Sequence, residues 1–268
     1  MNLKFLWINL SRIILLLIVF VASQYLSALV MLFFSNLSNL IQRQTLDART
    51  LADSPTLMAF TIMLGALATL AVMKLSGWTD SQSFRLKKLH PATFCLSLLW
   101  MLPIIFIVNL LLESFALEDI NQELFARLIF NPWGVLALVF IGPFSEEVVF
   151  RMGIQHHLIR HRVRPWTAIL LTAVIFGIIH GNPAQIPGAV AFGIVLGWLY
   201  WRSGSIWLSV AAHVFNNLLS VLISWTTSDA ETTIAELCGS TKTTLEAACI
   251  SLILISFGFY YLNKALKA

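Results

Sequence analysis

The stretch PFSEEVVFR, residues 143–151, places two adjacent glutamates and an arginine inside the long apolar run 132–153. An ionisable side chain at the centre of a bilayer costs roughly 2.5–3.5 kcal/mol even on a lenient scale, so such residues normally face a bundle interior or a water-filled cavity. Of the thirteen acidic residues, Glu146 and Glu147 are the only two that lie well inside a predicted span. The stretch therefore predicts a membrane helix that carries a polar site.

The composition of the whole chain is typical of a polytopic membrane protein. Hydrophobic residues make up 58% of its 268 residues and charged residues 11%, well outside the averages of soluble domains. A helix that crosses a hydrocarbon core of ~30 Å needs about 20 apolar residues. Such runs predict an all-α fold, a single bundle of about eight transmembrane helices, near residues 11–34, 55–76, 92–113, 132–153, 166–180, 186–202, 205–226 and 245–263.

The basic residues predict the orientation, because cytoplasmic loops hold an excess of Lys and Arg. With eight spans and a cytoplasmic N-terminus, twelve of them lie inside and four outside, and Arg151 lies within a span. We therefore expect both termini in the cytoplasm, and the plasma (inner) membrane as the location if the source is bacterial. The net charge of +4 reflects this bias, and nucleic-acid binding is not expected because no basic, aromatic stripe lies on a soluble face.

The spacing of the charged residues separates two roles. Glu147 and Arg151 are four residues apart and share a helical face, which predicts a structural ion pair. Glu146 points to a different face, where Phe150 offers no charge, so another helix must supply its partner. The adjacent Gly-Pro pair at 142–143 predicts a break or kink in the helix.

Two histidines, His180 and His213, lie within or at the end of apolar runs, whereas the others lie in or beside basic loops. Glu146 and His180 are each fourteen residues from the loop between their runs, so an antiparallel hairpin would hold both about 21 Å from the turn. Asn217 follows His213 by four residues and shares its face. We expect a carboxylate, two imidazoles and an amide to converge at one depth, although His and Asn also join membrane helices as packing residues.

Three motifs together resemble a known family. EEVVFR (146–151), FGIIH (176–180) and HVFNN (213–217) fit E-E-x-x-x-R, F-x-x-x-H and H-x-x-x-N. In this order, each on its own span, they resemble the CPBP family of intramembrane glutamic endopeptidases, which includes the type II CAAX-prenyl endopeptidases. One departure is FRMG (150–153), because relatives often place Gly directly after the Arg.

The resemblance implies an organisation and a mechanism. It implies a catalytic core at 132–226. The apolar runs predict about three membrane helices before this core, in 1–131, and a loop and a last membrane helix after it, in 227–268, all in one membrane domain. Glu146 with His180 would activate water, and His213 with Asn217 would stabilise the oxyanion. No cofactor or metal is implied. The substrate would be a membrane-associated peptide or protein, and the sequence does not choose between a lipidated and an unmodified one.

Three alternatives stay open. Glu146, His180 and His213 are a plausible zinc ligand set for a metalloprotease, although no H-E-x-x-H helix is present. A non-catalytic scaffold or immunity protein of the same fold would use the polar core for recognition. A transporter would relay protons through the intramembrane carboxylate, although no inverted repeat is detectable.

Overall fold

The computed structural model describes residues 3–42, 47, 49–84, 89–226 and 233–266, and its elements in these ranges are all helical. The predicted all-α, multi-pass membrane fold is confirmed. Six helical segments of the described ranges are long and apolar enough to cross a membrane: Leu10–Ser35, Pro55–Leu75, Pro91–Glu113, Pro132–Arg160, Ile206–Thr226 and Thr241–Ala265.

The other two predicted runs form shorter helices. Helix α10 (Pro165–Ile178) is apolar but shorter than a typical span, and the 18-residue α11 (Ile186–Ser203) is not among the six candidates. The predicted orientation depends partly on residues that lie outside the described ranges, namely Arg43, Arg85, Lys87, Lys88 and Lys267. The orientation stays a prediction.

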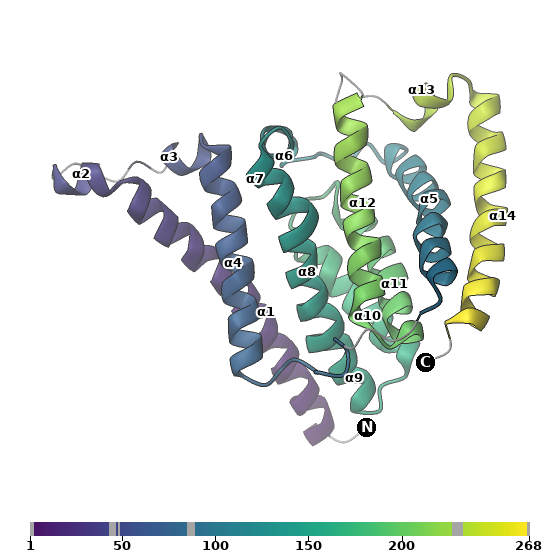
Figure 1. Ribbon diagram of the computed structural model, residues 1–268, viewed down its shortest axis with the longest axis horizontal. Helices are drawn as coiled ribbons and strands as arrows, with labels where there is room; N and C mark the ends of the chain where they lie inside the picture. The colour runs from purple at the N-terminus through teal and green to yellow at the C-terminus, as the bar shows by residue number, and fades with distance from the viewer. Residues whose placement is uncertain (1–2, 43–46, 48, 85–88, 227–232, 267–268) are drawn as a thin grey trace. The chain divides into compact units, whose positions relative to one another are not determined.

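The chain forms two compact units, each built from two separate stretches (Figure 1). The first contains Met1–Asp80 and Gln122–Arg162, and the second contains Ser81–Asn121 and Val163–Ala268. The predicted core, residues 132–226, contributes to both units, and its boundaries stay a prediction.

In the first unit, α1 (Leu3–Ser35) and α4 (Pro55–Leu75) pack against the long segment Pro132–Arg160. Short helices complete this unit: α2 (Leu37–Ile41), α3 (Arg49–Ala52) and α6 (Gln122–Ile129). A Cβ on Gly153 would lie only 3.0 Å from Met73 Cε and 3.1 Å from Leu16 Cδ1. The glycine of FRMG, although displaced by one position from the usual pattern, thus gives α1 and α4 close access to the long segment.

The segment that contains the glutamates alternates between α-helix and π-helix. It consists of α7 (Pro132–Val135), η1 (Leu136–Ile141), α8 (Gly142–Glu147), η2 (Val148–Gln155) and α9 (His156–Arg160). The backbone N–H of Gly142 donates to the Ala137 carbonyl, five residues back. The predicted break at Gly142-Pro143 is therefore wrong, because the helix continues and widens into π geometry before the proline, which has no N–H to donate. Such π-helical turns are rare in proteins, and those that occur are often at functional sites.

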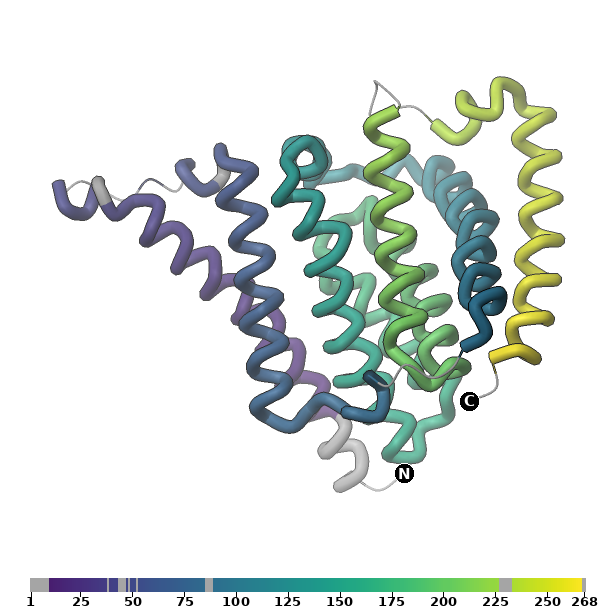
Figure 2. The backbone as a smooth tube through the Cα atoms, viewed as in Figure 1, coloured from purple at the N-terminus to yellow at the C-terminus, as the bar shows by residue number. Residues whose placement is uncertain are grey.

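The second unit contains α5 (Pro91–Glu113), α10, α11, α12 (Ile206–Thr226), α13 (Ile234–Cys238) and α14 (Thr241–Ala265). Gly177 allows helices α10 and α11 to approach closely, because a Cβ at this position would lie only 2.4 Å from Val190 Cγ2. Helix α14 lies beside α5 (Figure 2), where Trp100 Nε1 donates to the Ile255 carbonyl at 3.0 Å. Helix α11 ends at Gly204, whose φ of +60° favours glycine.

Candidate functional site

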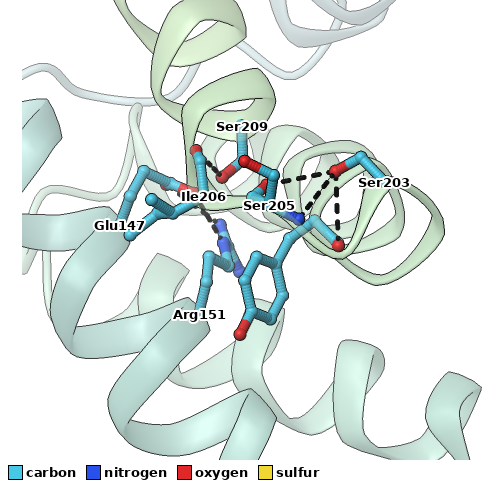
Figure 3. A network of polar contacts seen from close by, with 7 residues as sticks. Glu147, Arg151, Ser203, Ser205, Ile206 and Ser209 are labelled. Carbon is cyan, nitrogen blue, oxygen red and sulfur yellow. Dashed lines mark hydrogen bonds and ion pairs between the residues drawn. The ribbon is translucent and has the colours of Figure 1, made fainter. Parts of the chain in front are cut away.

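Glu147 and Arg151 form a buried ion pair in the first unit. Arg151 Nε donates to Glu147 Oε2 at 2.9 Å, and Arg151 Nη2 donates to Oε1 at 3.4 Å (Figure 3). Both side chains are 0% exposed. Because a buried charge is costly unless it is paired and hydrogen-bonded, this contact fixes the turn that joins α8 to η2.

Glu146 occupies a different environment on the same helix. Its side chain is partly exposed, whereas the side chain of Glu147 is completely buried, as expected for neighbours that point about 100° apart on a helix. Gly142 lies one turn earlier, and a Cβ there would come 4.0 Å from Glu146 Oε1. The hydroxyl of Ser145 donates to the Gly142 carbonyl at 2.9 Å. Ser145 and Glu147 are buried, whereas the Glu146 side chain is partly exposed. Its carboxylate is therefore the one of the three groups that water can reach, and a carboxylate is able to accept a proton from water.

His180 lies in the turn that follows α10, two residues beyond the last helical residue, Ile178. The predicted run 166–180 therefore extends past the helix by two residues. His180 Nδ1 lies 2.7 Å from the carbonyl oxygen of Phe176. A carbonyl only accepts, so Nδ1 is the donor, and a neutral imidazole then keeps Nε2 as its proton acceptor.

His213 and Asn217 lie four residues apart on α12, and Phe176 links this helix to the His180 turn. The Phe176 ring packs edge-to-face against the imidazole of His180, with centroids 4.8 Å apart, and against that of His213, with centroids 5.8 Å apart. His213 is 7% exposed. The Asn216 side-chain amide donates to Asn217 Oδ1 at 3.1 Å, so the oxygen of Asn217 is the acceptor in this contact and its Nδ2 supplies the donors.

Asn182, which was not among the predicted site residues, holds the turn that carries His180. Its Nδ2 donates to Asp119 Oδ1 at 2.6 Å, and its Oδ1 accepts the Ile120 N–H at 3.3 Å. The side chain is 0% exposed, and the Asn182 carbonyl accepts the Gln185 N–H at 2.9 Å. The sequence offers only an Asn-Pro pair in HGNPAQ as a signal, which is typical of any turn.

A group of serines closes the turn between α11 and α12 (Figure 3). Ser203 Oγ donates to the Ser205 carbonyl at 3.1 Å, and Ser209 Oγ donates to the Ile206 carbonyl at 2.9 Å. Ser203 and Ser209 thus direct their hydroxyl hydrogens to nearby backbone oxygens, which is not the environment of an activated nucleophile. Ser205 Oγ accepts the Trp207 N–H at 3.4 Å and so caps the start of α12.

The predicted site residues divide between the two units. The first unit contains Glu146, Glu147 and Arg151, and the second contains His180, His213 and Asn217. Within the second unit, Phe176 brings the two imidazoles together, while the convergence of Glu146 with them stays a prediction. Among the described residues, no group of three or more His, Cys, Asp and Glu could hold one metal ion.

Comparisons with known proteins place all three motifs in one matched region. The family described as "Type II CAAX prenyl endopeptidase Rce1-like" matches residues 128–219. "Putative membrane peptidase YdiL" of Bacillus subtilis (strain 168) is 30% identical over 92 residues, which cover 34% of this chain and 37% of the relative. "Uncharacterized protein YyaK" of the same strain is 31% identical over 116 residues, which cover 40% of this chain and 37% of the relative. The chain thus spans 37% of the length of each relative. No solved structure matches the chain.

Proposed function

Because residues 128–219 match the Rce1-like family of type II CAAX prenyl endopeptidases, we propose that this chain is a member of that family and an intramembrane peptidase. It hydrolyses a peptide bond of a membrane-associated peptide or protein. Glu146 and His180 activate the attacking water, and His213 and Asn217 stabilise the oxyanion of the tetrahedral intermediate.

The observation that carries the proposal is the hydrogen bond between His180 Nδ1 and the Phe176 carbonyl, 2.7 Å long. It holds the imidazole in the tautomer whose Nε2 accepts a proton, and it fixes the ring orientation at the same time. A residue that orients the attacking water needs both properties, since the water donates a hydrogen bond to a lone pair aimed at it. In the proposed reaction, His180 orients the water and Glu146 takes its proton.

The second pair supplies hydrogen-bond donors. His213 offers a ring N–H, and Asn217 offers its Nδ2 hydrogens, because its Oδ1 already accepts from Asn216. Donors on a rigid helix are effective for an oxyanion because they need no rearrangement when the charge develops. In the proposed reaction, His213 and Asn217 on one face of α12 therefore donate hydrogen bonds to the oxyanion, while Glu146 and His180 activate the water.

The substrate class follows from where the motifs lie. Each motif lies on or directly after an apolar helix, so a peptide that reaches them is membrane-embedded or membrane-anchored. The family description names prenylated CAAX substrates, which makes a farnesylated peptide ending in a CAAX sequence the first defined substrate to test. Unmodified membrane peptides are the second class.

The decisive experiment compares Glu146→Gln with a matched control. Glu123→Gln is suitable, because Glu123 lies in the same unit and its side chain is 83% exposed, so the charge change is identical. Membranes from cells that express each variant at equal levels are analysed for accumulated and missing peptides, and the purified proteins are incubated with the farnesylated peptide.

We expect Glu146→Gln to abolish cleavage, because an amide does not accept the proton of water, and Glu123→Gln to behave as the wild type. Products that form at the wild-type rate in folded Glu146→Gln protein would exclude the proposed mechanism. A wild-type protein that cleaves nothing while Glu146→Gln alters binding of a partner would favour the scaffold alternative.

A further inference from the structure

A cluster of basic side chains lies at one end of the first unit, and its Arg160 follows Glu146 by fourteen residues, which is about 21 Å along a helix. Arg12 comes from α1, and His157 and Arg160 come from α9. None of these residues belongs to the three motifs, and the proposed hydrolysis does not use them.

Arg12 presents an unpartnered hydrogen-bond donor. Its guanidinium lies over the Trp78 ring, with Cζ 5.5 Å from the ring centroid, so one face is covered by an aromatic surface. Its Nε is buried and has no hydrogen-bond partner among the described residues. A buried donor that lacks an acceptor costs free energy, and the cost is greater when the group is charged.

His157, on which Arg12 acts electrostatically, presents a second unpartnered polar group. Its side chain is 7% exposed, and its Nε2 is buried and makes no hydrogen bond to any described residue. The ring is held in place by a stacked contact with the His161 ring, with centroids 4.0 Å apart, while His161 Nδ1 lies 2.8 Å from the His157 carbonyl oxygen. The site is therefore built from fixed side chains, in contrast to a set of mobile surface lysines.

The charges of the cluster act on one another. Arg12 lies within electrostatic range of Arg160, and both arginines act on His157. The acidic side chain that acts on this end of α9 is Asp80, which faces the neighbouring His156. Neither arginine forms an ion pair with a described residue. Like charges held together repel, so an anion bound between them would be stabilising.

The position of the cluster indicates the source of the anion. Arg12 lies near the start of the candidate span Leu10–Ser35, and Arg160 is the last residue of the span Pro132–Arg160. Residues at the ends of spans lie at the level of the lipid headgroups, where basic pockets between helices bind anionic lipids. The guanidinium fork also matches the oxygens of a phosphate.

We propose that Arg12, Arg160 and His157 form a binding site for the phosphate group of an anionic phospholipid. The lipid phosphate lies between the two guanidinium groups and accepts hydrogen bonds from Arg12 Nε and His157 Nε2. Its acyl chains lie along the apolar surface of α1. The bound lipid thereby joins α1 to the end of α9.

Thermal unfolding of the purified full-length protein tests this site. The protein in zwitterionic micelles is titrated with phosphatidylglycerol, with phosphatidylcholine, or with inorganic phosphate. A ligand that binds only the folded state raises the unfolding temperature in a saturable manner. We expect phosphatidylglycerol alone to do so. Arg12→Gln and Arg160→Gln should each weaken its apparent affinity by at least about tenfold, the loss expected for one charge-assisted hydrogen bond.

Two further variants make the result specific. Arg127→Gln removes the same charge from an exposed arginine that is already paired with Glu123, and it should leave the affinity unchanged. Arg12→Lys keeps the charge and loses the planar fork, so it tests the site if Arg12→Gln does not fold, and it should also bind more weakly.

Three outcomes would overturn the proposal. The first is equal stabilisation of the wild type by phosphatidylcholine and phosphatidylglycerol. The second is an equal loss of affinity in Arg127→Gln, which would mean that only net charge matters. The third is saturable stabilisation by inorganic phosphate alone, which would assign the site to a free anion instead of a lipid.

Discussion

Replacing Glu147 by Gln should strongly destabilise the protein, because Arg151 would keep its charge in a completely buried site. The two contacts of the pair, 2.9 and 3.4 Å long, lie between side chains that are both 0% exposed. Breaking such a pair costs about 3–5 kcal/mol, since the remaining charge is left desolvated and uncompensated. A loss of this size is a large part of the stability of a typical domain.

The same unit contains a matched control with opposite burial. Arg127 and Glu123 are also four residues apart on a helix, with Nη2 and Oε1 separated by 2.6 Å, but their side chains are 43% and 83% exposed. Exposed pairs of this kind contribute about 0.3–0.5 kcal/mol. Glu123→Gln should therefore have close to a tenth of the effect of Glu147→Gln, although the two substitutions are chemically identical.

The assay is a double-mutant cycle on the free energy of unfolding, measured in mixed micelles by titration with a denaturing detergent. The cycle uses Glu147→Gln, Arg151→Gln and the double variant, and the same set is made at Glu123 and Arg127. We expect a coupling free energy of at least about 2 kcal/mol for the buried pair, because cycles isolate the pairwise contribution from other changes. Coupling energies that are equal at the two sites would refute the assignment of burial as the cause.

The remaining predictions concern the site and the orientation. His213→Ala and Asn217→Ala should each lower kcat by about 10² to 10³ while substrate still binds, and activity should survive chelation; one zinc per chain that is lost with His213 would contradict this. Asn182→Ala should speed amide hydrogen exchange at Ile120 and in the turn after α10, as mass spectrometry can measure. Unchanged exchange would exclude the role of Asn182 in holding that turn. A reporter fused after Arg164 should indicate the cytoplasm, and the opposite result would reverse the predicted topology.

Hydropathy alone predicted the long helices, but it placed the end of α10 too late. The residues Ile178 and Ile179 are equally apolar, so a run of hydrophobic residues does not distinguish the last helical turn from the turn that follows. The chain turns because Gly181 adopts a φ of +65°, a conformation that glycine reaches without strain. Glycine beside the motif histidine was the available signal for this end.

The π-helical segments on both sides of α8 had no counterpart in the sequence prediction. Pro143 was correctly recognised as a residue that interrupts the α-helical hydrogen bonds. Whether a chain responds with a break, a kink or a widened turn depends on the packing around it, and here Gly142 donates to Ala137 so that the helix continues. The four-residue spacing of Glu147 and Arg151 still brings the two side chains together, because α8 and η2 remain one helical segment.

The site itself separates into local and long-range contributions. The F-x-x-x-H spacing contains the contact that fixes the His180 tautomer, since a residue four positions earlier in a helix offers its carbonyl to that turn. The partners that hold the turn in space are different in kind, because Asn182 bonds to Asp119 across 63 positions of sequence. A buried amide with both ends satisfied is an inference that only tertiary structure permits. A variant that keeps Phe176 and His180 but loses the Asn182 contacts should therefore preserve the tautomer of His180 and lose the position of its ring. This loss should reduce kcat more than it weakens the binding of substrate.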